Sequence, residues 1–191
     1  MNQDPFKEYI RESEPNKREK GYAWQTAIGL QAVDGLKTSK YLIDTAIRNI
    51  EGDISIDEVN SLLNSYYEEN PKQDPGDRTE EADKVSVRIV KVLSETGFSF
   101  TPNEYISIHK KLFTGIYRHA GKIRDYNITK KEWVLDGETV LYGNASELRD
   151  TLEYDFSEER TFSYKGLSIN EIIHHLAVFV SRLWQIHIFG E

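Results

Sequence analysis

Apolar residues recur every three or four positions along most of this chain, which is the spacing of amphipathic α-helices. The spacing predicts helices near residues 22–33, 39–51, 56–69, 79–94, 102–116 and 144–159. Local end signals support several of them: Ser55 and Glu58 have the spacing of a capping box, Gly52 suits a left-handed C-cap, and Pro102 suits a first helical position.

Residues 168–187 form the most apolar stretch, with apolar side chains on nearly every side of the predicted helix. A helix that is apolar all round is typical of a central, buried position. We therefore expect a mainly α fold, a helical bundle around this central buried helix.

Residues 121–142 follow a different pattern, because β-forming residues flank Asp136 and Gly137. An Asp-Gly pair between such residues favours a two-residue type I′ turn. The sequence predicts one β-hairpin with strands near 132–135 and 138–141.

Prolines and glycines divide the chain into three parts. Residues 1–20 are polar and contain Pro5 and Pro15, so we expect a flexible N-terminal arm with at most one short helix. Residues 21–70 are expected to form an N-terminal helical segment. Residues 70–79, which contain Pro71, Pro75 and Gly76, are the predicted linker to a core over residues 79–191.

Charge and composition exclude several classes of function. The 24 Lys and Arg against 32 Asp and Glu give a formal net charge of −8, which argues against nucleic acid as a partner. The chain has no cysteine, which excludes disulfides, thiolate zinc sites and cysteine nucleophiles. It has neither an apolar signal core near its start nor a stretch long enough to span a membrane, so we expect a cytoplasmic protein that does not bind membranes.

The histidines offer two candidate sites. Glu171 and His174 have the i, i+3 spacing of di-iron bundles, but such sites need the pattern twice, so we interpret His174 and His175 as one packed and one surface histidine. His187 ends the apolar helix, four residues before Glu191. Two interpretations stay open: a base beside a carboxylate that binds a divalent metal, or a C-cap histidine favoured by the helix dipole.

Residues 183–191, Leu-Trp-Gln-Ile-His-Ile-Phe-Gly-Glu, resemble the start of the Fic (Fido) family signature HPFx[D/E]GN[G/K]R with its usual lead-in. Residues 120–124, Ala-Gly-Lys-Ile-Arg, resemble the family's Ala-Gly-x-x-Arg segment, and the predicted hairpin falls where Fic proteins carry a flap that positions the target peptide. The resemblance covers about residues 80–191.

Fic proteins are mainly helical and typically transfer AMP from ATP to a Ser, Thr or Tyr hydroxyl of a target protein. The resemblance therefore implies that His187 is the general base, that Glu191 binds Mg²⁺, and that Phe189 and Gly190 belong to the loop that binds ATP. It also implies a flap that contacts the target protein through Trp133, Val134, Leu135 and Tyr142.

The chain departs from the signature in two ways. Ile188 replaces the signature's proline, which removes a fixed φ angle and is expected to loosen the loop. The Gly-Asn-x-Arg half does not follow Glu191, so we expect a C-terminally incomplete core that is inactive or very weak. An in-frame Gly-Asn-x-Arg in the DNA downstream would favour the enzyme, and a stop codon there would favour a remnant.

Many Fic proteins carry an inhibitory helix, [S/T]xxxE[G/N], and Glu51 with Gly52 fits its last two positions. Ile47 stands where Ser or Thr is expected, so the match is partial. The resemblance implies autoinhibition through Glu51, while an ordinary helix end with a glycine C-cap explains the same residues without any regulatory role.

Other functions stay open beside the transferase. The chain could instead be a non-catalytic helical module that binds a partner protein through exposed aromatic side chains or the edge of the hairpin. Variant Fic chemistry, such as phosphate transfer or AMP removal, is a further alternative. An uncovered apolar core would also favour self-association.

Overall fold

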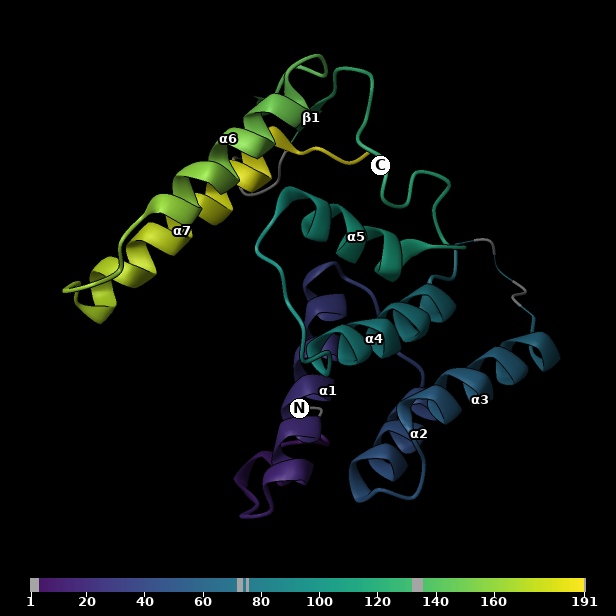
Figure 1. Ribbon diagram of the computed structural model, residues 1–191. Helices are drawn as coiled ribbons and strands as arrows, with labels where there is room; N and C mark the ends of the chain where they lie inside the picture. The colour runs from purple at the N-terminus through teal and green to yellow at the C-terminus, as the bar shows by residue number, and fades with distance from the viewer. Residues whose placement is uncertain (1–3, 72–73, 75, 132–135, 191) are drawn as a thin grey trace. The chain divides into compact units, whose positions relative to one another are not determined.

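The computed structural model describes residues 4–71, 74, 76–131 and 136–190, and it divides the chain into two compact units, Met1–Gly97 and Phe98–Glu191 (Figure 1). The prediction of a mainly α protein with one small hairpin is confirmed. No helix among these residues combines the length and the apolar character that crossing a membrane requires.

The first unit contains a short 3₁₀ helix, η1 (Tyr9–Arg11), and four α-helices: α1 (Pro15–Val33), α2 (Lys40–Glu51), α3 (Ile56–Glu69) and α4 (Thr79–Leu93). Helix α1 packs against η1, α2 and α4, and α3 packs against α2 and α4. Trp24, Leu42 and Leu63 are almost completely buried in its core.

The N-terminal arm is a correction to the sequence prediction. Phe6 is buried in the core of the first unit, and α1 begins at Pro15 rather than near Tyr22. Proline suits the first turn of a helix because its missing N–H has no partner to lose there. Part of the segment that we expected to be flexible therefore forms the start of α1, and Phe6 contributes to the core of the first unit.

The boundary between the units also differs from the prediction, because it follows Gly97 rather than lying within residues 70–79. The carboxylate of Asp83 on α4 is fully buried, and it accepts hydrogen bonds from the backbone N–H of Ser39 (2.8 Å) and the hydroxyl of Tyr67 on α3 (2.7 Å). These contacts join α4 to the helices that precede the predicted linker.

The second unit contains α5 (Pro102–Phe113), β1 (Thr129–Lys131), β2 (Thr139–Leu141), α6 (Leu148–Thr161) and α7 (Ile169–Ile186). Helices α6 and α7 run antiparallel, side by side, as the green and yellow ribbons of Figure 1 show. Phe156 on α6 and Phe179 on α7 meet edge to face, with ring centroids 5.4 Å apart, and Phe100 packs against both.

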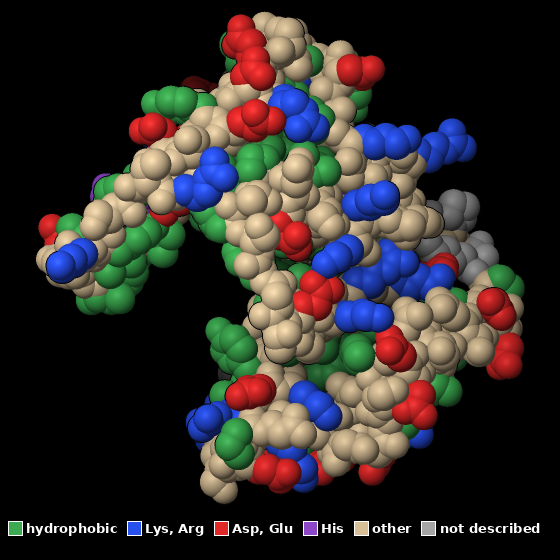
Figure 2. All heavy atoms as spheres, in the orientation of Figure 1, with side chains coloured by type: hydrophobic (Ala, Val, Ile, Leu, Met, Phe, Trp, Pro, Cys, Tyr) green, Lys and Arg blue, Asp and Glu red, His purple; other side chains and the backbone are tan. Residues whose placement is uncertain are grey.

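The prediction that α7 is a central buried helix is wrong. Phe179 and Ile186 are its buried residues among those described, while Ile169, Ile173 and Val180 are each more than half exposed. Hydrophobic side chains gather along the α6–α7 pair in Figure 2. The cause is that α7 packs along one side against α6, so its other apolar faces are left uncovered in this unit.

The hairpin is present, but its strands do not pair in the register that a two-residue turn at Asp136 and Gly137 would give. Asp136 and Gly137 both have positive φ angles, 54° and 82°, as a type I′ turn requires. Leu141 nevertheless pairs with Thr129, and Lys131 pairs with Thr139. The described part of the first strand is thus earlier than predicted, and residues 132–135, which the prediction placed in that strand, lie outside the described residues.

Candidate functional site

The candidate site is built around the turn that ends α7. This helix begins with a capping box, in which the Ser168 hydroxyl accepts from the Glu171 N–H and the Glu171 carboxylate accepts from the Ser168 N–H. It ends at His187, the C-cap, whose φ of 45° and ψ of 66° are left-handed. A non-glycine residue there carries a strain of about 1–2 kcal/mol, so the surrounding structure must hold it in place.

Arg124 provides much of that hold. Its side chain is 4% exposed, and its Nε–H donates to the carbonyl oxygen of His187 at 2.8 Å. Its Nη2 donates to the carbonyls of Ile186 (3.1 Å) and Gly143, and its Nη1 donates to the carbonyl of Tyr126 (2.6 Å). Carbonyls at a helix C-terminus lack helical partners and carry partial negative charge, so a cation stabilises them.

The residues after His187 continue as an extended segment beside residues 123–124. The backbone N–H of Arg124 donates to the carbonyl of Ile188 at 2.9 Å, and Ile123 forms an antiparallel bridge with Phe189. Ile188, which stands in place of the signature's proline, is 1% exposed. Packing and backbone pairing therefore fix this position without a proline ring.

Phe189 lies against the core through an aromatic stack. Its ring is parallel to the His109 imidazole on α5, with centroids 3.6 Å apart and an interplanar angle of 5°. The backbone N–H of Gly121 donates to Nδ1 of His109 at 2.9 Å, which leaves Nε2 to carry the proton. Burial, together with the nearby His119, lowers the pKa of His109 from 6.5 to about 4, so its ring is neutral at pH 7.

Tyr142 directly follows β2 and contacts the imidazole of His187. The two ring centroids are 4.6 Å apart, and the Tyr142 ring meets Trp184 edge to face at 5.6 Å. Its side chain is buried, and His187 is half-buried. Of the predicted flap residues, Tyr142 thus lies beside the histidine, whereas Trp133, Val134 and Leu135 lie outside the described residues.

Gly190 sits where a side chain does not fit. A Cβ atom at this position would come within 2.6 Å of the Tyr126 hydroxyl oxygen. Glu191, the predicted metal ligand, lies outside the described residues. Within the part of the chain that the structure describes, no group of three or more His, Cys, Asp or Glu side chains could bind a metal ion.

The other histidine pair is separate from this turn. His175 stacks on Phe162 at 3.5 Å, and its Nε2 lies 2.6 Å from a carboxylate oxygen of Glu159. His174 is exposed. This agrees with the interpretation of one packed and one surface histidine on α7.

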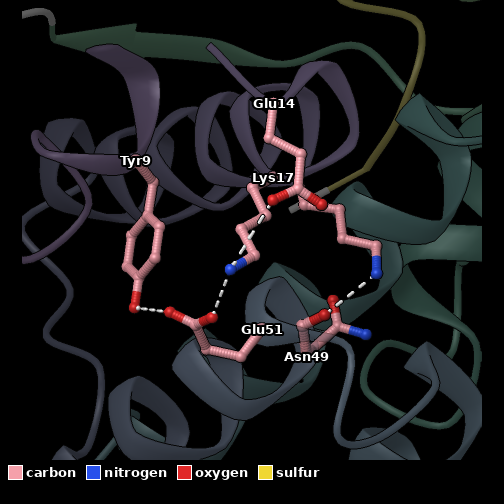
Figure 3. A network of polar contacts seen from close by, with 6 residues as sticks. Tyr9, Glu14, Lys17, Asn49 and Glu51 are labelled. Carbon is pink, nitrogen blue, oxygen red and sulfur yellow. Dashed lines mark hydrogen bonds and ion pairs between the residues drawn. The ribbon is translucent and has the colours of Figure 1, made fainter. Parts of the chain in front are cut away.

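Glu51, the predicted regulatory residue, ends α2 in the first unit, and Gly52 is its left-handed C-cap with φ of 90°. Its carboxylate accepts from the Tyr9 hydroxyl (2.7 Å) and from Nζ of Lys17 (2.7 Å), as Figure 3 shows. Hydrogen bonds from Lys17 and then Tyr9 lower the pKa of Glu51, and the bond to Glu51 raises the pKa of Tyr9 to about 12. The charged carboxylate therefore has two partners from the N-terminal segment.

Two residues of this arrangement gave no clear signal in the sequence. Arg124 belongs to the Ala-Gly-Lys-Ile-Arg segment that carries the resemblance, but nothing local indicates that it reaches residues 186 and 187. His109 is one histidine on an amphipathic helix, and its partners Gly121 and Phe189 lie 12 and 80 positions away along the chain.

One comparison with known proteins matches the second unit to a family. The family model described as Fic/DOC family matches residues 99–191, which is nearly the whole second unit. Neither the curated proteins nor the solved structures that were compared with the chain gave a match.

Proposed function

Residues 99–191 are a domain of the Fic/DOC family, and on that premise we propose that the protein is a Fic-type adenylyltransferase. It transfers AMP from ATP to a Ser, Thr or Tyr hydroxyl of a target protein. We also propose that the protein acts in the cytoplasm. The observation that carries the proposal is the imidazole of His187, held in a left-handed turn beside the hairpin by Arg124 and Tyr142.

In the proposed reaction, His187 accepts one proton. The target hydroxyl oxygen forms a bond to the α-phosphorus of ATP, and the bond between that phosphorus and the oxygen leading to the β-phosphate breaks. Pyrophosphate leaves, and the imidazole of His187 takes the hydroxyl proton. A base in a fixed position makes this step efficient, since rate depends on the alignment of the attacking oxygen.

In this proposal, Glu191 would hold Mg²⁺ together with the phosphates of ATP. Magnesium is usually bound through one or two carboxylates plus substrate phosphate oxygens, and Glu191 supplies one carboxylate in this proposal. When bound, the metal neutralises charge on the phosphates. Phe189 holds the loop through its stack on His109, and Gly190 lets the Tyr126 hydroxyl pack closely against the loop backbone; we assign both residues to the ATP-binding loop.

The hairpin is the proposed contact for the target protein. Its described strands are three residues each and mostly exposed, so an extended peptide can approach their edge. Trp133, Val134, Leu135 and Tyr142 are assigned to this flap, with Tyr142 supporting the base while the other three contact the target.

Glu51 is the proposed inhibitory residue. An inhibitory carboxylate acts by pairing with an arginine that would otherwise bind ATP, and Gly52 ends its helix so that Glu51 is the last helical residue. Because Tyr9 and Lys17 bind the same carboxylate, inhibition competes with these two contacts.

The position of a label in ATP shows which group is transferred to the target protein. A form of the protein carrying the complete signature is incubated with Mg²⁺ and ATP labelled at either the α- or the γ-phosphate. We expect protein labelling from the α-label alone and a mass increase that corresponds to AMP. Labelling from the γ-phosphate would instead establish phosphate transfer, and removal of AMP from a modified protein would establish the reverse activity.

A second candidate function rests on the exposed side of α7. Ile169, Ile173, Leu176, Val180 and Trp184 are exposed at helical spacing, which makes a continuous apolar stripe of the kind that binds proteins. We propose that a second copy of the chain occupies it, which is the protein-binding alternative to catalysis.

A further inference from the structure

We propose that Arg124 is a positioning residue for the base, because its guanidinium sets where His187 stands relative to the hairpin. The inference rests on the proposed function, since positioning matters for catalysis only if His187 is the base. The contacts themselves belong to the second unit and need neither ATP nor a target protein.

The guanidinium joins three separate segments. It donates to Tyr126, three residues before β1 begins, and to Gly143, two residues after β2 ends. It also donates to the carbonyls of Ile186 and His187 at the end of α7. Both ends of the hairpin and the turn that carries the imidazole therefore meet at one side chain.

The geometry requires arginine rather than another cation. A guanidinium presents five N–H donors in a planar fork, so it can serve carbonyls on several sides at once, whereas the lysine ammonium carries three donors on one atom. Arg124 is buried, which lowers its pKa, so the carbonyls of Tyr126, Gly143, Ile186 and His187 satisfy its N–H groups in place of water.

The same contacts also position Tyr142, whose ring lies beside the His187 imidazole. Gly143, which accepts from Arg124, directly follows Tyr142, whose ring lies against His187. The backbone N–H of Gly143 also donates to the carbonyl of Gln185 at 3.3 Å, which adds a second link to α7. Removing the Arg124 guanidinium therefore frees both the strained backbone of His187 and the Tyr142 ring that supports it.

The test uses nuclear magnetic resonance on the 191-residue chain. The Arg124→Lys variant is compared with the wild type and with Arg149→Lys, a control that changes an exposed arginine paired with Glu153 on α6. The contact between the His187 and Tyr142 rings reports the position of the base. The contact between Phe156 and Phe179 reports the fold of the α6–α7 pair.

We expect Arg149→Lys to keep both contacts, and Arg124→Lys to keep the Phe156–Phe179 contact while losing the His187–Tyr142 contact. If Arg124→Lys keeps the His187–Tyr142 contact at wild-type strength, the proposal is overturned. If this variant loses both contacts, the wild type decides: scalar coupling across the hydrogen bond from Arg124 Nε–H to the His187 carbonyl supports the proposal, and its absence refutes it.

Catalysis gives a separate readout in the form with the complete signature. Arg124→Lys is expected to lower kcat by about 100-fold with little change in the KM for ATP, because a misplaced base slows chemistry more than binding. Failure of AMP transfer in the wild type would refute the proposed function while leaving the resonance experiment to judge Arg124.

Discussion

The imidazole of His109 lies flat on the ring of Phe189, with centroids 3.6 Å apart, and thereby joins α5 to the segment that follows His187. Because Gly121 donates to Nδ1 of the same imidazole, His109 also holds the segment that leads to Arg124. One neutral histidine thus supports two sides of the candidate site.

This stack predicts that acid destabilises the second unit. The pKa of His109 is lowered by burial from 6.5 to about 4, so the unfolded chain binds more protons than the folded one between these values. Stability is therefore full above pH 6.5 and falls as the pH drops towards 4, by at most about 1.4 kcal/mol per pH unit. Chemical denaturation from pH 4 to 8 measures it.

His109→Leu should flatten this part of the profile, and His174→Leu, which changes an exposed histidine on α7, should leave it as in the wild type. A His109→Leu profile as steep as that of the wild type would show that His109 is not responsible.

The position of Gly121 predicts that a side chain added there lowers the free energy of unfolding. Its φ is 69°, and a Cβ there would lie 2.5 Å from the Cβ of Lys110. Gly115 is a matched control, since its φ is 79° but nothing lies within 4 Å of an added Cβ. Gly115→Ala should cost about 1–2 kcal/mol from the backbone alone, and Gly121→Ala about 1–3 kcal/mol more from the clash, measured by urea denaturation. Equal costs would argue against the close approach of α5 to residue 121.

Glu51 predicts a difference between stability and activity. Its contacts with Tyr9 and Lys17 are exposed and screened by solvent, so Glu51→Gln should leave the free energy of unfolding close to that of the wild type. In the form with the complete signature, the same variant should raise the rate of AMP transfer, because it removes the charge proposed to inhibit. Lys17→Met, which frees the carboxylate from one partner, should lower that rate, and a rise would contradict the proposed competition.

The stripe on α7 predicts self-association. Sedimentation velocity should show the 191-residue chain as a dimer whose fraction rises with concentration, and Val180→Glu should make it monomeric. Tyr154→Glu, which alters an exposed aromatic residue on α6, is the control that should stay dimeric. A monomer at every concentration, with a sharp and concentration-independent thermal transition, would refute the dimer.

Local signals predicted several of the helix ends. The capping box at Ser55, the left-handed C-cap at Gly52 and the proline at the start of α5 are present, because each depends on residues within one turn of helix. The position of His187 at the end of α7 followed from the same kind of evidence.

Features that depend on distant partners were harder to predict. The apolar pattern of α7 gave its helical character but not which faces would be covered, and the Asp136–Gly137 turn did not determine that Thr129 pairs with Leu141. Arg124 reaches carbonyls 62 and 63 positions away, so its role becomes visible when the fold brings those segments together.

The most direct test of the account compares two histidines of the α7 region in the form with the complete signature. His187→Ala should lower the single-turnover rate of AMP transfer from ATP by about 10²–10⁴-fold, as expected for loss of a general base. His174→Ala, at an exposed position on the same helix, should transfer AMP at the wild-type rate. A His187→Ala protein that labels its target as fast as the wild type would contradict the central claim.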